Sequence, residues 1–532
     1  RLSYGLFKQD VLSLADIFEN FRQACMNYYK LDLANYLFAP SLAWDAMLCL
    51  TNIELDLITD LKMLDLIEKM KRGGLCFVGS KRYIKANNKY MKNFNPNDPS
   101  NYIMYWDANN LYGWAMSQSL PYKDLKFDTE VSLTEILETP DDSDKGYFIE
   151  CDLHFPEHLH DKFKEYPPCP ENLIPQLEWF SDYQKEVGTI TGAIRKNEKY
   201  SGTPKLIPHL MDHKNYVIHY RNLKFIKDLG VEITAVHNVI SFTQKPWLSE
   251  YISFKTEKRK KALNDFEKDL FKLMYNAVVG KTMENVKNRM QLHISTDNEN
   301  AKKWFSKLKF AVCRALEGIY LIEMYRNEIV YDKPVYVGTS VLDLSKLCMM
   351  DFHYNTIHKN FEDNYNLIYS DTDSLVYSIY HEDIYEWIKN NNNHFDLSDS
   401  IRPDMKDNNN KKVLGKFKDE MNTLLTTEFL ALNPKVYSIM HQDMKTTGEI
   451  IEKNKKTLKG VSKVVVKKEI SHKDYQEVLQ DNQPKTRTVT SIRSFNQQVY
   501  TYKQNKIDLA SVYDKMVMHD SVNSNTYGYI KE

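Results

Sequence analysis

Residues 367–377 read Leu-Ile-Tyr-Ser-Asp-Thr-Asp-Ser-Leu-Val-Tyr and give the clearest local prediction in the chain. Two runs of β-branched and aromatic residues joined by a short polar tip predict a β-hairpin. Because strand side chains alternate, Asp371 and Asp373 are expected on the same side near that tip. Neighbouring carboxylates repel each other unless a cation neutralises them. The stretch therefore predicts a divalent-metal site.

The Asp-x-Asp tip is open to other interpretations. Asp suits turns through local hydrogen bonds, so a solvated loop is the simplest one. A calcium loop is excluded, because its third ligand position would be Leu375 and no glycine follows. Sugar-nucleotide transferases, and phosphatases with an aspartyl nucleophile, also carry a strand that ends in Asp-x-Asp. By itself the tip indicates metal and phosphate chemistry only.

Composition sets the class of protein. The chain has 532 residues, too many for one core, and its 42% hydrophobic and 12% aromatic content indicates several folded subdomains. The seven cysteines show neither zinc-ligand spacing nor a disulfide framework, which favours an intracellular setting, nucleus or cytoplasm. No apolar run is long enough to span a bilayer and no signal peptide is evident, so no membrane partner is expected.

Charge is balanced overall and uneven locally. The net charge is −1, but residues 453–493 hold eleven Lys or Arg against four Asp or Glu. A solvated surface is the usual interpretation of such a run, and a surface that follows a phosphate backbone is the more specific one.

Asp107 follows a second expected strand. Residues 102–106 predict a buried strand, and a short helix is expected from Leu111. An acid at such a junction is often a helix cap. If Asp107 lies beside Asp373 across a sheet, it instead supplies the second carboxylate of a two-metal site.

Residues 249–283 predict two helices joined near Asn264. On the second helix Lys272, Asn276 and Gly280 recur every four residues and share a face. That face is either solvated, or a platform that holds a triphosphate and lets a base pair approach Gly280.

The remaining stretches predict simpler structure. Residues 9–30 and 205–226 have helical spacing, 231–242 predict a strand, and 342–346 are expected in a helix before the hairpin. Residues 123–200 predict an irregular, loop-rich subdomain. Gly73 and Gly74 either end a helix or allow close approach of a ligand.

Four of these stretches, together with Lys435-Val436-Tyr437, resemble motifs of the family B DNA polymerases. The resemblance is to the protein-primed branch of viruses, linear plasmids and Polinton/Maverick-type transposons, and it covers nearly the whole chain in family order. The motifs are the glycine pair (Arg72-Gly73-Gly74), motif A (Asp107-Ala108-Asn109-Asn110-Leu111-Tyr112), motif B (Lys272 to Gly280), motif C (Tyr369 to Ser374) and Lys-x-Tyr (Lys435-Val436-Tyr437).

Three motifs depart from the family pattern. In motif A, Asn110 stands for serine and Gly113 for proline. In motif B, Ala277 and Val279 occupy positions where serine and tyrosine are common. Arg72 replaces an aromatic residue beside the glycine pair.

The resemblance implies residue roles for two-metal nucleotidyl transfer with Mg²⁺, or Mn²⁺ as a substitute. It also implies primer-template DNA, dNTPs and a terminal priming protein as partners of a monomer. The metal ligands would be Asp107, Asp373 and the Ala108 carbonyl, with Asp371 as a supporting acid. Lys272 and Arg259 would bind the triphosphate, and Tyr112 would exclude a 2′-hydroxyl. Asn276 and Gly280 would contact the nascent base pair, and the DNA would be bound by Lys435, Tyr437, Gly73 and Gly74.

The implied fold is α+β, a right-hand polymerase fold with an antiparallel palm sheet, helical fingers, a thumb and two insertions. The expected segments are 1–71 (a C-terminal remnant of an exonuclease-like domain, with a linker), 72–122 (palm start with motif A), 123–200 (first insertion, similar to a terminal-protein region), 201–248 (palm), 249–283 (fingers with motif B), 284–335 (second insertion), 336–450 (palm with motif C and Lys-x-Tyr) and 451–532 (thumb).

The N-terminus departs from the family. The chain begins with Arg1 rather than Met, which suggests a fragment or a processed end, and it begins too late for the first two exonuclease motifs. Asp10 stands where the third motif would place its acid, but Leu6 replaces the usual tyrosine. We expect a truncated exonuclease domain and no nuclease activity.

Two other functions stay open at this point. A sugar-nucleotide transferase would use the Asp-x-Asp tip but leaves motif B and Lys-x-Tyr without a role. A degraded mobile-element polymerase that only binds DNA would account for the substituted motif positions, although the carboxylates are intact.

Overall fold

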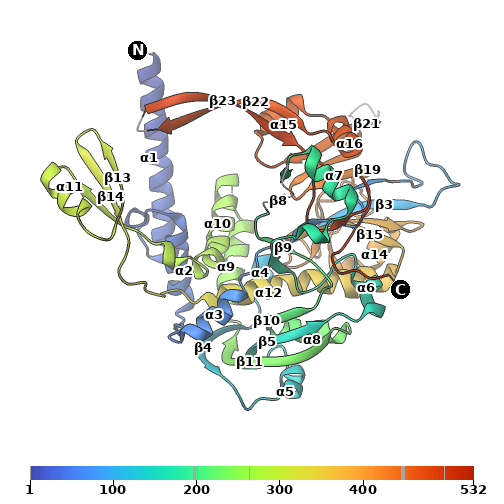
Figure 1. Ribbon diagram of the computed structural model, residues 1–532, viewed down its shortest axis with the longest axis horizontal. Coiled ribbons are helices and arrows are strands. Elements are labelled where there is room, and N and C mark those ends of the chain that lie inside the picture. The colour runs from blue at the N-terminus through green and yellow to red at the C-terminus, as the bar shows by residue number, and fades with distance from the viewer. Residues whose placement is uncertain are drawn as a thin grey trace.

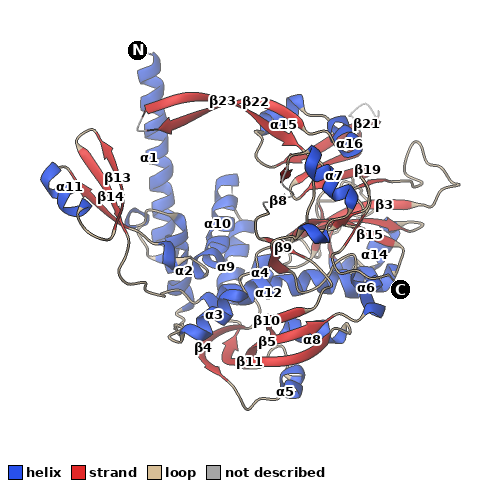
Figure 2. Cartoon of the chain, in the orientation of Figure 1, coloured by secondary structure: helices blue, strands red, loops and turns tan. Residues whose placement is uncertain are grey.

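The computed structural model describes residues 2–195, 199–200, 202–262, 264–444, 450–495 and 498–531. Helices and strands are mixed throughout, as the sequence predicted (Figures 1 and 2). The long helix α1 (Leu2–Tyr29) and the strands between residues 425 and 458 lie on opposite sides of the view in Figure 1. None of the described helices has the length and hydrophobicity to cross a membrane.

A six-stranded sheet occupies the centre of the larger hydrophobic core. The predicted hairpin forms its middle, because the apolar residues of both strands are fully buried. All neighbouring strands are antiparallel except the last pair. In spatial order the strands are β1 (Cys76–Val78), β15 (Tyr365–Asp371), β16 (Ser374–Tyr380), β3 (Asn101–Ala108), β18 (Phe417–Asp419) and β17 (Phe395–Asp396).

A second, four-stranded sheet corrects two predictions. A strand of ten residues runs through the segment expected to be irregular, and the helix expected over 205–226 is wrong in its first half. Pairing with β5 holds residues 213–219 extended, and only residues 220–228 form a helix. The order is β10 (His213–His219), β5 (Lys145–His154), β11 (Glu232–Lys245) and β4 (Leu120–Phe127), with α8 (Tyr220–Asp228) beside it.

Helix α12 (Val335–Asp351) is the central helix, and all but its last residue are buried. It contacts helices of the N-terminal half as well as strands of the second sheet. This helix therefore joins the two large hydrophobic clusters. The helices around it are α2 (Ala39–Thr51), α3 (Leu61–Lys69), α4 (Leu111–Met116), α9 (Ser249–Lys260) and α10 (Asp265–Thr282).

The C-terminal part builds a third sheet with a long hairpin. The sheet has the order β2 (Tyr83–Lys85), β19 (Leu425–Asn433), β20 (Val436–Met444) and β21 (Ile450–Leu458), packed by α15 (Lys463–Glu469) and α16 (His472–Asp481). The hairpin of β22 (Lys485–Phe495) and β23 (Gln498–Leu509) extends toward α1 in Figure 1.

Several smaller elements lie around the three sheets and the central helix. A three-stranded sheet with α11 (Asn298–Phe305) projects near α1 in Figure 1. Its strands are β12 (Gln291–Ser295), β14 (Ile319–Met324) and β13 (Phe310–Leu316). The remaining α-helices and strands are α5 (Leu133–Glu138), α6 (His160–Phe163), α7 (Asp182–Ile190), α13 (Lys359–Phe361), α14 (Ile384–Asn390) and the short pairs β6 (Glu171–Leu173) with β9 (Lys205–Ile207), β7 (Ile194–Arg195) with β8 (Lys199–Tyr200), and β24 (Val517–Met518) with β25 (Ser524–Asn525).

Residues 511–527 return to the edge of the six-stranded sheet. The buried Tyr513 hydroxyl accepts a hydrogen bond from the Val78 backbone N–H and donates one to its carbonyl, both at 2.9 Å. Arg82 donates to the Ser511 carbonyl at 2.7 Å. Strand β1, which pairs with the Asp371 strand, is thus fixed by the C-terminal residues.

Candidate active site

Asp107 and Asp373 come from adjacent strands. Asp107 is the penultimate residue of β3, and Asp373 lies in the turn just before β16. Because β16 pairs with β3, Ser374 lies opposite Asp107, and the Ala108 N–H donates to the Asp373 carbonyl at 2.7 Å. The two acids, far apart in the sequence, are therefore held together by the backbone of the sheet.

The electrostatics of the pair show how closely the two carboxylates interact. Burial and the Asp373 charge raise the pKa of Asp107 to about 8. Burial and the charge of Asp371 raise the pKa of Asp373, while Lys272 lowers it. Glu420 adds a further negative charge that raises the pKa of both acids. Negative charge is concentrated here, and Lys272 compensates it only in part.

Asp371 has a cation of its own. The Lys435 ammonium donates to both of its carboxylate oxygens at 2.8 Å. The Lys435 N–H also donates to the Tyr369 hydroxyl at 2.8 Å. Lys435, expected at the DNA, thus lies at the end of β15 and is about half exposed.

The glycine pair lies against the hairpin tip. The Thr372 N–H donates to the Leu75 carbonyl at 2.7 Å, which brings the tip onto residues 73–75. A Cβ atom on Gly74 would lie only 2.3 Å from Thr372 Oγ1, whereas a Cβ on Gly73 would meet nothing within 4 Å. Gly74 is therefore required for close packing, and Gly73 faces open space.

Helix α10 presents the predicted face. Lys272, Asn276 and Gly280 are all exposed, while Met274 and Val278 are buried on other sides. Leu273, next to Lys272, is 46% exposed. Lys272 is close enough to Asp107 and Asp373 to lower the pKa of both. The stretches around residues 107, 272 and 373 thus converge on one site.

Arg259 lies next to this site with other cations. It donates to the Tyr275 hydroxyl at 3.1 Å and lines a cavity of about 130 Å³ together with Lys412 and Lys418. Lys418 lies opposite Asp107 in the pairing of β18 with β3. Asp396 and Asp399 also line the cavity, and Asp399 pairs with Lys418 at 2.9 Å, so the three cations exceed the acids by one. Cations at such a position can bind phosphate oxygens.

The two departures in motif A compensate each other. Asn110 adopts a left-handed conformation (φ 45°) and accepts from the Gly113 N–H at 3.3 Å, which caps α4. A Cβ on Gly113 would lie 2.0 Å from Asn110 Nδ2. Asn110 therefore needs Gly113, and the cap places the half-buried Tyr112 near Asp373.

Tyr437, also expected at the DNA, is buried. Its hydroxyl lies 3.3 Å from the Tyr105 hydroxyl on β3, and its ring stacks on Phe429. In this position Tyr437 supports the strand that carries Asp107.

The sequence did not single out Glu420, Lys412 or Lys418. Glu420 is positioned by a backbone hydrogen bond to Tyr105 (2.8 Å), one residue past β18. In the sequence, only the apolar Phe417 followed by the polar Lys418 hinted at this three-residue strand.

The donor set at Asp107, Asp373 and Ala108 fits Mg²⁺. Oxygen ligands from one or two carboxylates are what this ion takes from proteins, and the mutual repulsion of the acids favours a cation between them.

At the N-terminus, Asp10 is exposed on α1, and the side chain of Leu6 lies outside the described residues. The absence of nuclease activity stays a prediction.

No protein-family model matches the chain. No curated protein matches it. Solved structures of phi29 DNA polymerase do match: the orthorhombic crystal form is 14% identical with a TM-score of 0.55, and 89% of this chain and 68% of that chain are covered. The complex with primer-template DNA and incoming nucleotide covers the same shares at 15% identity and a TM-score of 0.52, and the complex with single-stranded DNA has 14% identity and a TM-score of 0.51.

The chain has a DNA-polymerase-like fold. In this polymerase-like fold the acids at 107 and 373, and the lysine at 272, lie at one site on the six-stranded sheet and α10.

Proposed function

We propose that the chain is a DNA-templated DNA polymerase of family B, from the protein-primed branch. It would add dNTPs to a primer 3′-hydroxyl during replication of a viral or mobile element. The convergence of Asp107, Asp373 and Lys272 within a polymerase-like fold carries this proposal. The six-stranded sheet would be the palm, α9 and α10 the fingers, and the strands and helices after residue 450 the thumb. Residues 123–200 and 284–335 would be the two insertions, the first of them the site for a terminal priming protein.

Asp107, Asp373 and the Ala108 carbonyl would hold two Mg²⁺ ions, with Mn²⁺ as a substitute. When bound, two such ions supply a more acidic primer 3′-hydroxyl and a stabilised pyrophosphate leaving group. Asp371, held by Lys435, would support the site from outside the ligand shell.

The other residues would bind and orient the substrates. Lys272, with Arg259, Lys412 and Lys418 behind it, would hold the triphosphate, because nucleotidyl transfer depends mainly on positioning and charge stabilisation. Tyr112 would lie under the sugar and exclude a 2′-hydroxyl.

The DNA would lie across the exposed face of α10 and the basic C-terminal segment. Asn276 and Gly280 would face the nascent base pair, and Gly73, Gly74 and Lys435 would line the path of the DNA. The buried Tyr437 would support this region from behind, through its contact with Tyr105. The basic segment 453–493 would contact phosphates, which gives salt-dependent affinity with little sequence preference.

Primer extension on a defined template with Mg²⁺ and dNTPs tests the proposal. We expect template-directed extension by the unaltered chain and a loss of at least about a hundredfold in Asp107→Ala and Asp373→Ala, with DNA binding retained. Asp182→Ala, at an exposed acid of α7, is the matched control.

Other results separate the alternatives. DNA binding without extension by the unaltered chain would indicate a degraded polymerase. Binding of a sugar nucleotide in place of primed DNA would indicate a transferase. Near-normal extension by Asp107→Ala would contradict the assignment of the acids.

A further inference from the structure

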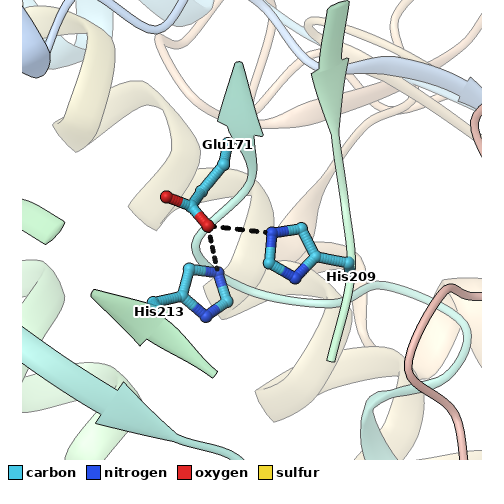
Figure 3. Close-up of side chains that lie close together, drawn as sticks. All are labelled: Glu171, His209 and His213. Carbon is cyan, nitrogen blue, oxygen red and sulfur yellow. Dashed lines mark hydrogen bonds and ion pairs between the residues drawn. The ribbon is translucent and has the colours of Figure 1, made fainter. Parts of the chain in front are cut away.

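A second group of ligand-type side chains lies apart from Asp107 and Asp373. Glu171 begins β6, His213 begins β10, and His209 lies between β9 and β10. Both imidazole rings and the carboxylate point toward one another (Figure 3). Their ligand atoms all lie within 4.8 Å of one another.

The two histidines are unusual for their burial. His209 is 1% and His213 0% exposed, and their rings stack with centroids 4.3 Å apart. Among the described residues, neither Nδ1 atom has a hydrogen-bond partner. The Nε2 atoms do have partners, Glu171 Oε2 for His209 and the Cys169 carbonyl oxygen for His213, and they face the carboxylate (Figure 3).

The distances from the Nε2 atoms to the carboxylate suit a shared ion. Glu171 Oε2 lies 3.0 Å from His209 Nε2 and 3.8 Å from His213 Nε2. Ligands at about 2.0–2.1 Å from a tetrahedral Zn²⁺ ion are separated by about 3.3 Å, which falls between these two distances. The Cys169 carbonyl oxygen, 2.8 Å from His213 Nε2, is a further oxygen donor next to this histidine.

We propose that Glu171 Oε2, His209 Nε2 and His213 Nε2 bind one Zn²⁺-class ion, with the Cys169 carbonyl oxygen completing the site. Two imidazoles and a carboxylate are a donor set for divalent transition metals rather than for Mg²⁺. The ion would tie the segment 169–173 to the first strand of the second sheet. Because His209 also bridges to Tyr527, it would fix the C-terminal residues at the same point. Its role is structural and independent of the polymerase site.

The metal content of the full chain tests this site. The protein is expressed with added ZnSO₄, dialysed against metal-free buffer and analysed by mass spectrometry for zinc. We expect about one zinc per chain, and after exchange with Co²⁺ the visible absorption bands of a four-coordinate ion. His213→Ala and Glu171→Gln should each reduce the zinc content at least fivefold and lower the melting temperature of the zinc-loaded protein.

The controls keep the result decisive. His154 pairs with Asp212 at 2.7 Å on the surface. This pair offers only two ligand groups, too few for a zinc site, so His154→Gln should leave the zinc content unchanged. Because a buried histidine variant could unfold, Glu171→Gln, at a partly exposed position, is read together with its circular dichroism spectrum. Zinc-free unaltered protein, or full zinc retention by folded Glu171→Gln, would overturn the proposal.

Discussion

The Lys435 ammonium lies 2.8 Å from each carboxylate oxygen of Asp371. This bidentate contact joins the turn between β19 and β20 to the end of β15, next to the turn that holds Asp373. The positive φ of Lys435 (63°) and its N–H bond to Tyr369 fix the direction of the side chain. This ion pair links the third sheet to the candidate active site, as does a second one at 3.4 Å between Lys455 of β21 and Glu420.

Lys435→Gln should slow primer extension by roughly tenfold or more, because the hairpin tip loses the contact that positions it. The loss of folding stability should stay below about 1 kcal/mol, since the pair is partly exposed. Extension rates and urea unfolding check both statements. Lys214→Gln, which breaks the Lys214–Asp152 pair on the second sheet, should leave the rate unchanged. An unaltered rate in Lys435→Gln would contradict the positioning role.

Gly74→Ala should reduce extension by roughly tenfold or more, because the new Cβ would displace Thr372 and with it the tip. Gly73→Ala is the matched control, since a Cβ there meets nothing within 4 Å. Thr372 has a positive φ of 62°, so Thr372→Gly fits its backbone and should restore activity to Gly74→Ala. Equal rates for the two alanine variants would show that the packing against Thr372 is unimportant.

Asp107→Asn should stabilise the metal-free protein near pH 8 by roughly 1–3 kcal/mol, because it removes a buried carboxylate next to Asp373. The raised pKa of Asp107 means that the folded state binds the extra proton between about pH 4 and pH 8. Its contribution to stability therefore falls as pH rises through this range. Thermal unfolding in EDTA checks the variant against exposed Asp182→Asn.

Divalent metal should reverse this destabilisation. Millimolar Mn²⁺ should raise the melting temperature of the unaltered chain, because an ion that binds only the folded state stabilises it. Asp107→Asn and Asp373→Asn should lose most of that rise. A full rise in both variants would place the bound metal elsewhere.

Tyr112→Ala should admit ribonucleotides, lowering the preference for dNTPs over rNTPs by roughly 10–200-fold. The side chain is half-buried on α4 near Asp373, so its volume is what a 2′-hydroxyl would meet. Tyr112→Phe keeps that volume and should keep the preference. Competition between dNTP and rNTP in single-nucleotide extension measures the ratio, and an unchanged ratio in Tyr112→Ala would refute the role.

Lys255→Met should stabilise the protein below pH 7. Lys255 is fully buried on α9 and donates to the Tyr29 hydroxyl of α1, and burial lowers its pKa to about 7. Between pH 7 and about 10.5 the unfolded state carries the extra proton, so stability from this group rises with pH and is lowest below pH 7. Melting temperatures at pH 6 and pH 9 should converge in the variant, whereas exposed Lys260→Met should follow the unaltered chain. Parallel curves for Lys255→Met would contradict this.

Local patterns predicted the elements that carry the acids. The hairpin at 367–377 and the strand before Asp107 are apolar runs with clear ends, and residues 264–282 carry a cap and a helical period. Their convergence was expected from the resemblance, because no local pattern relates residues 107, 272 and 373.

Structure that depends on contacts between residues far apart in the chain could not be predicted from local sequence patterns. Residues 213–219 form a strand only through β5, so the helix expected there is wrong. Glu420 reaches the site through the three-residue strand β18, which pairs with β3. Tyr437 is buried because Tyr105 and Phe429 surround it. The Glu171–His209–His213 group likewise depends on contacts between distant segments.

The hydrogen bonds between Tyr513 and Val78 of β1 form only after the C-terminal residues have been synthesised. The edge strand next to the Asp371 strand is completed by residues that leave the ribosome long after both acids. A nascent chain that ends before residue 511 would expose this edge, so the last part of translation and the assembly of a working active site should coincide.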